Sequence, residues 1–395
     1  MTEIKIPFNK PSFTGKELEY IKEAVLSGKI SGDGIYTEKC HKSLERKFNA
    51  RKVLLTTSCT HALEMASILL DLKAGDEVIV PSYTFVSTVN AFMLRGAKPV
   101  FVDIRLDTKN IDENFIEEKI TKNTKAIFPV HYAGISCDMD TIMDIARRHN
   151  IYVVEDAAQG VNAKYGNKYL GTIGTFGCYS FHETKNFICG EGGALVINNE
   201  RFLERAEIIR EKGTNRSKFF RGEVDKYTWV DIGSSYLPSD ILAAFLFAQL
   251  ENIEKITSIR KKIYERYYGG LISLEKEGII NLPAIPTPCV SNYHMFYIEV
   301  KNETERNNLI EYLKEEGVSS VFHYVPLHLS PMGLELGYKK GDFPVTEDIS
   351  ERLLRLPFYN EITEEEQEYV INKIKNHFIC KSDLSSNNKN KICSS

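Results

Sequence analysis

The feature that most constrains this chain is the alternation of short apolar runs with helical patterns between residues 52 and 200. Nearly continuous apolar runs are typical of strands that are covered on both faces. Strands that alternate with helices predict βαβ units around a mostly parallel sheet. The runs are KVLLTT (52–57), DEVIVP (76–81), KPVFVD (98–103), TKAIFPV (124–130), IYVVED (151–156), FGCYSF (176–181) and GALVIN (193–198). The last two are too close in sequence for a helix between them, so they can pair directly and the sheet can be mixed.

The rhythm changes after a long helical region at about 238–269. Three prolines in LPAIPTPCV (282–290) read as a linker. A smaller α+β unit follows, with strands HMFYIEV (294–300) and SSVFHYV (319–325) and helices at about 303–316 and 362–378. We therefore predict a large domain with an N-terminal segment at 1–255, a small C-terminal domain at 256–380 and a disordered tail at 381–395.

Charge and cysteine usage narrow the class of protein. The 395 residues carry 50 Lys plus Arg against 54 Asp plus Glu, a net charge of −4, which gives no electrostatic case for nucleic acid or an anionic membrane as a partner. No window approaches the roughly 18 apolar residues of a spanning helix, and the start lacks the apolar core of a secretory signal. The eight cysteines are scattered without a C-x-x-C pair. We expect reduced thiols, no metal site and a cytoplasmic protein.

Polar residues at the carboxyl ends of parallel strands are the first candidates for a site, because ligands bind there. The hydroxyl-rich turn 56–60 precedes a helix and suits a phosphate, although it could be an ordinary N-cap. Phe85, at another strand-to-helix junction, could stack on a flat ring or belong to the core. Asp156 ends an apolar strand and needs a cation or donors, which a neighbouring helix could also supply.

Lys185 follows the next strand, 29 positions after Asp156, just before a glycine-rich turn. A buried lysine can lose its proton or form a covalent bond with an aldehyde, whereas most lysines are simply solvated. Each signal is weak alone, but their order matches the needs of pyridoxal 5'-phosphate. That cofactor requires a phosphate site, a stacked ring, a carboxylate at the pyridine nitrogen and a lysine at the aldehyde.

The segments VEDAAQG (154–160), SFHETKN (180–186) and GEGGAL (190–195) resemble the sugar-nucleotide aminotransferases of the DegT/DnrJ/EryC1/StrS family, from about residue 6 to 378. The resemblance implies an aspartate-aminotransferase-like fold (PLP fold type I), an α/β architecture with a mixed, mainly parallel sheet and a smaller C-terminal α+β domain. Relatives with histidine at the lysine position act as dehydratases, so Lys185 favours transamination.

The resemblance also implies roles for single residues. Lys185 falls on the cofactor-linked base, Asp156 on the partner of the pyridine nitrogen, Gln159 near the ring hydroxyl and Phe85 on the stacking aromatic. The phosphate-binding positions fall on Cys59, Thr60 and Ser180. A homodimer with shared active sites is implied, and Ser235 stands where the family commonly places an asparagine that contacts the partner's phosphate. Candidate sugar contacts are His182, His323 and Tyr324, which could instead orient a loop or end a strand.

Longer stretches, among them SGKISGDGIYTEKC and REKGTNRSKFFRGEVDKYTW, are similar to family members that act on a dTDP-linked sugar. They imply amine transfer from L-glutamate to C4 of dTDP-4-dehydro-6-deoxy-D-glucose, giving dTDP-4-amino-4,6-dideoxy-D-galactose for surface polysaccharide. Alternatives stay open: another nucleotide keto-sugar, an amino-acid aminotransferase or lyase, or a non-catalytic regulator. Cys178 and Cys189 near Lys185 raise a desulfurase as a further alternative.

Overall fold

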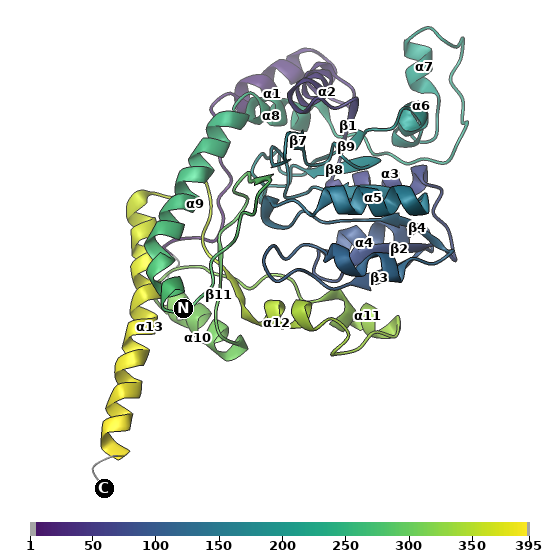
Figure 1. The fold of residues 1–395 in the computed structure, drawn as a ribbon. Helices are drawn as coiled ribbons and strands as arrows, with labels where there is room; N and C mark the ends of the chain where they lie inside the picture. The colour runs from purple at the N-terminus through teal and green to yellow at the C-terminus, as the bar shows by residue number, and fades with distance from the viewer. Residues whose placement is uncertain (1–4, 393–395) are drawn as a thin grey trace.

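The structure, a computed structural model, describes residues 5–392 and is built around a mixed sheet (Figure 1). The strands of this sheet are β1 (Lys52–Thr56), β2 (Glu77–Pro81), β3 (Lys98–Val102), β4 (Thr124–Ile127), β5 (Tyr152–Asp156), β8 (Phe176–Ser180) and β9 (Gly193–Ile197). They lie in the order β1-β9-β8-β5-β4-β2-β3. β9 pairs antiparallel with both of its neighbours, and the other pairings are parallel. The predicted mixed, mainly parallel sheet is therefore confirmed, including the direct pairing of β8 with β9.

Helices cover both faces of the sheet, which explains the near-continuous apolar strands. In β2, Val78 and Val80 pack in the core beneath α3 and α4, whereas Ile79 points to the opposite core beneath α5. Successive side chains of a strand point to opposite faces, so both faces must be apolar. The covering helices are α1 (Glu17–Leu26), α2 (Ile35–Phe48), α3 (Cys59–Leu69), α4 (Val86–Met93), α5 (Met139–His149), α6 (Leu203–Arg210) and α8 (Asp240–Leu250).

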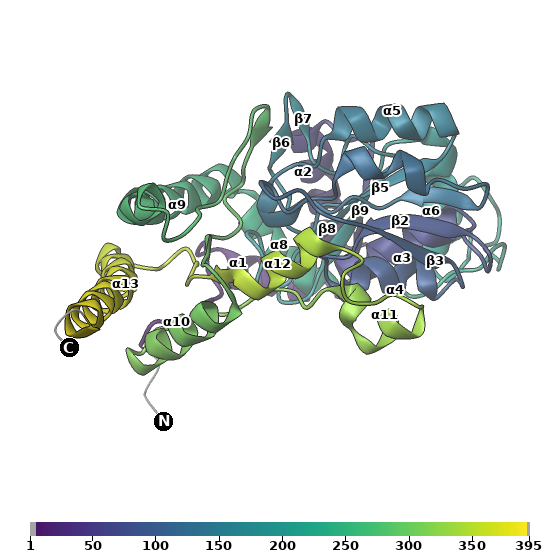
Figure 2. The same ribbon diagram turned by 60° about the horizontal axis from the view of Figure 1, so that its bottom comes forward.

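A smaller unit with its own apolar core lies beside the sheet (Figure 2). Its core joins α9 (Ile253–Lys276), β11 (Tyr297–Glu299), α10 (Glu303–Glu315), β12 (Leu353–Arg355) and α13 (Glu364–Ile392). α11 (Pro331–Glu335) and α12 (Pro344–Arg352) belong to the same part of the chain, but Leu327 and Phe343 on either side of α11 pack in the core that covers the large sheet. The strand predicted at 319–325 is wrong. Only Val321 pairs, in an isolated bridge with Arg355, and the following His323 and Tyr324 line a cavity instead of extending the pairing. We call this body the small unit and the rest the large unit.

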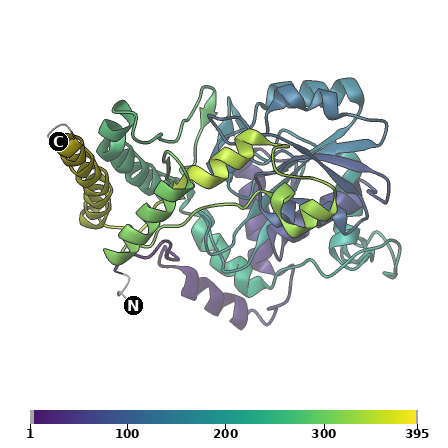
Figure 3. The ribbon, with the colours of Figure 1, turned by 90° about the horizontal axis from the view of Figure 1, so that it is seen from below.

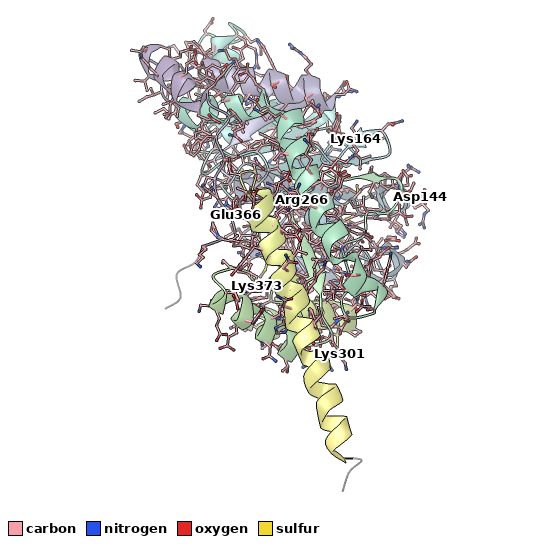
Figure 4. The ribbon with its side chains drawn as sticks, turned by 90° about the vertical axis from the view of Figure 1, so that its left-hand side faces the viewer. Asp144, Lys164, Arg266, Lys301, Glu366 and Lys373 are labelled. Carbon is pink, nitrogen blue, oxygen red and sulfur yellow. The ribbon has the colours of Figure 1, made fainter. Side chains whose placement is uncertain are left out.

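Both ends of the described chain lie at the small unit (Figure 3). Ile6 packs in the small-unit core and bridges to Val318, so the N-terminal segment contacts the small unit rather than the large unit alone. At the other end, α13 crosses α9 and extends beyond the body (Figure 4). α13 continues to Ile392, so the disorder predicted from residue 381 is wrong as far as that residue. The prediction failed because a polar segment without periodicity gives no helical signal. Residues 393–395 lie outside the described residues. The domain boundary at 255 stays a prediction.

An arm between α6 and α8 projects from the large unit and carries α7 (Arg216–Phe220). Large apolar side chains of this arm face solvent, including Phe220 and Trp229, which is 76% exposed. A small separate sheet joins β10 (Cys289–Val290), β6 (Lys164–Tyr165) and β7 (Lys168–Tyr169). Within residues 5–392, no helix combines the length and apolar character that crossing a membrane requires.

Candidate active site

A cavity of about 660 Å³ opens at the carboxyl edge of the sheet, where the large and small units meet. Residues that follow or end β1, β2, β5 and β8 line it, together with residues of the small unit. The residues predicted from sequence that line this cavity are Cys59, Thr60, Phe85, Asp156, Gln159, Ser180, His182, Lys185, His323 and Tyr324. Ser235 does not line it; it lies exposed beside the arm, bridged to Glu211. The predicted residues other than Ser235 therefore lie around one cavity, and their roles stay predictions.

The floor of the cavity is formed by the N-termini of α3 and α4. Ser58 caps α3 by accepting a hydrogen bond from the backbone N–H of His61 (3.1 Å), and the Thr60 hydroxyl joins the two helix starts by donating to Ser87 (2.8 Å). At Gly193, a Cβ would lie 2.3–2.5 Å from the backbone of Ser58 and Cys59, so only glycine lets β9 approach this turn. Free N–H groups and positive helix ends make the floor suitable for a phosphate.

Asp156 ends β5 and is only 5% exposed. Its carboxylate accepts hydrogen bonds from the Thr88 hydroxyl (2.7 Å) and from the backbone N–H of Ala158 (3.1 Å). Both donors stabilise the ionised carboxylate, which would otherwise be costly at this depth. The carboxylate therefore lies against the first turn of α4 and has one hydrogen-bond donor at each oxygen.

Lys185 lies on the turn that follows β8, where its backbone N–H donates to the His182 carbonyl (2.9 Å). Burial lowers the pKa of the Lys185 ammonium, an effect that Cys59 and Asp156 oppose and Arg355 reinforces. Among the described residues, none forms a hydrogen bond or an ion pair with Lys185 Nζ. The lysine is thus placed to act as an amine rather than as half of a structural ion pair.

The wall above the sheet edge combines amide, phenol and imidazole groups. Gln159 accepts from the Ala133 N–H (2.7 Å) and donates to the Tyr324 hydroxyl (2.9 Å). The Tyr324 ring stacks on His323 at 3.7 Å, and Tyr132 hydrogen-bonds His323 Nδ1 (2.6 Å). Burial lowers the pKa of His323 and raises that of Tyr324, so both groups are neutral near pH 7. Phe85, 57% exposed, lies across the cavity with its ring centre 6.5 Å from that of Tyr324.

Sequence reasoning missed two basic residues of the small unit that line the cavity, Arg355 and His294. Arg355 lies on β12 over the Phe8 ring, 4.8 Å from its centre, and its buried Nε has no hydrogen-bond partner among the described residues. His294 precedes β11 and is 8% exposed. Arg355 lies in a three-residue strand and His294 lies before a strand of the small unit, so the rule that ligands bind where parallel strands end did not point to either residue.

Other candidates contribute less. His182 lies at the mouth, where it hydrogen-bonds Thr184 and comes within 3.7 Å of Glu191, so it orients the turn that carries Lys185. Cys178 and Cys189 do not line the cavity, and burial raises the pKa of the Cys189 thiol to about 12. A neutral, enclosed thiol is a poor nucleophile, which argues against a desulfurase. No cluster of metal-ligating side chains occurs in the part of the chain that the structure describes.

Comparison with known proteins identifies the class. A model of the DegT/DnrJ/EryC1/StrS aminotransferase family matches residues 11–375. A pleiotropic regulatory protein of Geobacillus stearothermophilus is 34% identical, covering 86% of this chain and 89% of that protein. GDP-perosamine synthase of Escherichia coli O157:H7 is 32% identical, with 94% and 98% covered. A putative sugar aminotransferase of Streptococcus pneumoniae, solved in a PLP form, superposes with a TM-score of 0.87 at 29% identity, covering 94% and 98%.

The sheet order, the single antiparallel strand and the small C-terminal unit define a fold type I enzyme. The chain belongs to the DegT/DnrJ/EryC1/StrS aminotransferase family, as its sequence resemblance predicted.

Proposed function

We propose that this aminotransferase uses pyridoxal 5'-phosphate to move the amino group of L-glutamate to C4 of dTDP-4-dehydro-6-deoxy-D-glucose. The product is dTDP-4-amino-4,6-dideoxy-D-galactose, a precursor for surface polysaccharide. The observation that carries the proposal is one cavity that unites Lys185, the buried carboxylate of Asp156 and two helix N-termini. Membership of an aminotransferase family supports the reaction type.

The residues present fit the cofactor. The α3 and α4 N-termini, with Cys59, Thr60 and Ser180, would hold its phosphate. Asp156 would pair with the pyridine nitrogen and Phe85 would cover the ring. When bound, the cofactor supplies an electron sink that stabilises negative charge on the reacting carbon.

Lys185 moves the proton. In the first half-reaction its neutral Nζ takes the proton from the α-carbon of glutamate, and in the second half-reaction Nζ returns a proton to C4 of the sugar. Burial lowers the pKa of Lys185, so more of the lysine is unprotonated near pH 7 than in water. Asp156 accepts hydrogen bonds from Thr88 and Ala158, which would hold its carboxylate in place for the pyridine nitrogen.

Arg355 is suited to a carboxylate of L-glutamate. It is the arginine of the described chain that lines the cavity, and its Nε is buried without a protein partner. A guanidinium binds a carboxylate through two parallel hydrogen bonds, which fixes the donor's orientation. The neutral side chains of His323 and Tyr324 then serve the uncharged sugar ring, to which they can donate or accept hydrogen bonds.

A homodimer is part of the proposal. The exposed apolar side chains of the arm, among them Phe220 and Trp229, form a surface that a second copy of the chain would cover. Ser235 lies at the base of this arm, away from its own cavity, so its predicted phosphate contact would be made in the partner subunit. The cytoplasmic location stays a prediction.

The decisive test is product identification by NMR after incubation of the protein with cofactor, L-glutamate and dTDP-4-dehydro-6-deoxyglucose. We expect a 4-amino sugar with galacto configuration. A GDP-linked keto-sugar is the matched alternative substrate, because one relative is named GDP-perosamine synthase. Preference for plain 2-oxo acids would contradict the proposal. A protein that takes up no cofactor, and shows no covalent cofactor at Lys185 after borohydride treatment, would support the regulator, a reading favoured by the relative named as a pleiotropic regulatory protein.

A further inference from the structure

His294 is a buried histidine that lines the cavity. The hydrogen bonds around it define which ring nitrogen carries the proton. The amide of Asn186 donates to the Asn292 carbonyl (2.8 Å), so the Asn186 oxygen must face His294 Nδ1, also at 2.8 Å. An amide oxygen only accepts, and therefore Nδ1 carries the proton. In a neutral ring, Nε2 is then left with a free lone pair. Within the described residues, no hydrogen bond involves this Nε2.

The backbone around His294 is held rigidly. Arg260 of α9 donates to the carbonyls of Tyr293 (3.0 Å) and His294 (2.6 Å) and to the Asn360 side chain (3.1 Å). Arg260 is 4% exposed and lies over the Phe358 ring. A guanidinium forked onto backbone carbonyls leaves the segment little freedom to reorient the imidazole.

The same network reaches the catalytic lysine directly. Asn186 follows Lys185 in sequence, so the hydrogen bond to His294 fixes the turn on which Lys185 stands. His294 and Lys185 line the same cavity. The charged groups facing His294 are all cationic: Lys185, Arg260 and Arg355. Together with burial they lower the pKa of His294, so the ring stays neutral in the range where the enzyme would act.

We propose that His294 is a positioning residue for Lys185: in the cofactor-loaded enzyme its free Nε2 accepts a hydrogen bond from Nζ, a contact that is not formed in this structure. This inference deepens the proposed function and rests on it. With Nε2 as a fixed acceptor, the Lys185 amine keeps one orientation when it takes or returns a proton. Asn186 of the large unit fixes the tautomer of His294, and Arg260 of the small unit fixes the backbone that carries it. The proposed positioning therefore depends on both units.

The test uses cofactor-loaded enzyme and L-glutamate alone, so that no sugar is required. The rate at which the cofactor absorbance changes is measured from pH 5 to 9 in wild type, His294→Phe and His294→Gln. We expect His294→Phe to slow the maximal rate by about tenfold or more while half-saturation by glutamate changes less than threefold. His294→Gln restores an acceptor and should recover much of that rate. A rate in His294→Phe within twofold of wild type overturns the proposal.

A second variant keeps the proposal testable if His294→Phe folds poorly. Asn186→Asp places a carboxylate at Nδ1, which raises the pKa of His294, and protonated Nε2 can no longer accept. The acid limb of the rate profile should move up by about one pH unit. In an Asn186→Asp, His294→Gln double variant this shift should largely vanish. An equal shift in both backgrounds would place the effect on Lys185 alone and overturn the role of His294.

The outcomes separate the two proposals. If glutamate converts the cofactor but the dTDP-sugar is not aminated, the proposed substrate fails and the role of His294 is still decided by the variants. If wild type carries no covalent cofactor at Lys185 after borohydride treatment, both proposals fail. The melting temperatures of the variants are compared with that of wild type. A variant that is less stable but has an unchanged pH profile would indicate a purely structural role and would contradict the proposal.

Discussion

The two walls of the cavity differ in how they are built and in the charge they carry. The large-unit wall, which includes Asp156 and Lys185, comes from strand ends and helix starts, and each oxygen of the Asp156 carboxylate accepts a hydrogen bond. The small-unit wall, formed by His294, His323, Tyr324 and Arg355, comes largely from irregular segments and is neutral or cationic. In the proposed function, the rigid wall holds the cofactor permanently and the cationic wall receives substrates that come and go. The contrast predicts that variants of the first wall abolish chemistry, whereas variants of the second alter substrate use, with the exception of His294, which acts on Lys185.

The largest effect is expected from Lys185→Ala. Without the amine, no group in the cavity replaces the base, and turnover should fall by more than about 10³-fold. Circular dichroism and the melting temperature should stay near wild type, because the side chain makes no structural ion pair. Activity within tenfold of wild type would remove Lys185 from the reaction.

Asp156→Asn should be the next most damaging change. Asn has nearly the same shape but no charge, so it cannot stabilise a protonated pyridine nitrogen. We expect kcat to fall about 10²- to 10³-fold, a loss typical of one key electrostatic group. The measurement is the glutamate half-reaction, with cofactor content checked by absorbance. A comparable loss in His323→Gln would contradict the proposed difference between the walls.

Arg355→Gln tests the small-unit wall. Loss of the guanidinium should raise KM for glutamate by about tenfold to 100-fold and leave KM for the sugar within threefold of wild type. The matched control is Arg352→Gln on the same segment, which bonds Asp348 and the Val300 carbonyl and does not line the cavity. An equal rise in both KM values would exclude a dedicated carboxylate contact.

Thr88→Val probes the support of Asp156 with a smaller change. The substitution keeps the volume but removes the hydroxyl that donates to the carboxylate at 2.7 Å. We expect kcat to fall roughly threefold to tenfold, since the Ala158 N–H still donates. Steady-state rates at saturating substrates are the measurement. No change at all would show that the carboxylate depends on one donor.

The smallest effect concerns stability below neutral pH. The pKa of His323 in the folded protein lies well below its ordinary 6.5, so from pH 6.5 down to that lower value the unfolded chain binds more protons. Stability should therefore fall as pH falls through this window, by at most about 1.4 kcal/mol per pH unit for one group. Urea unfolding at pH 7.5 and 5.5 should show a smaller loss in His323→Gln than in wild type. An identical loss would mean that His323 titrates normally.

The same contrast explains what sequence could predict. The apolar runs located each strand of the large sheet to within a few residues, since strands buried on both faces leave a clear pattern. Because strand ends converge at one sheet edge, Asp156 and Lys185 were expected to lie near each other, and both line the cavity. The small-unit wall gave no such signal. The strand predicted at 319–325 does not form, and the roles of Arg355 and His294 depend on contacts with Phe8 and Asn186, residues far away in sequence.

Gly193 sets a limit on how this scaffold can diversify. Its backbone lies against the Ser58–Cys59 turn so tightly that any side chain would displace the start of α3. Descendants of this protein that adopt new sugars are therefore expected to keep the floor unchanged and to accumulate their differences in segments such as 319–325. Laboratory evolution of substrate range has the best prospects when randomisation is confined to those segments.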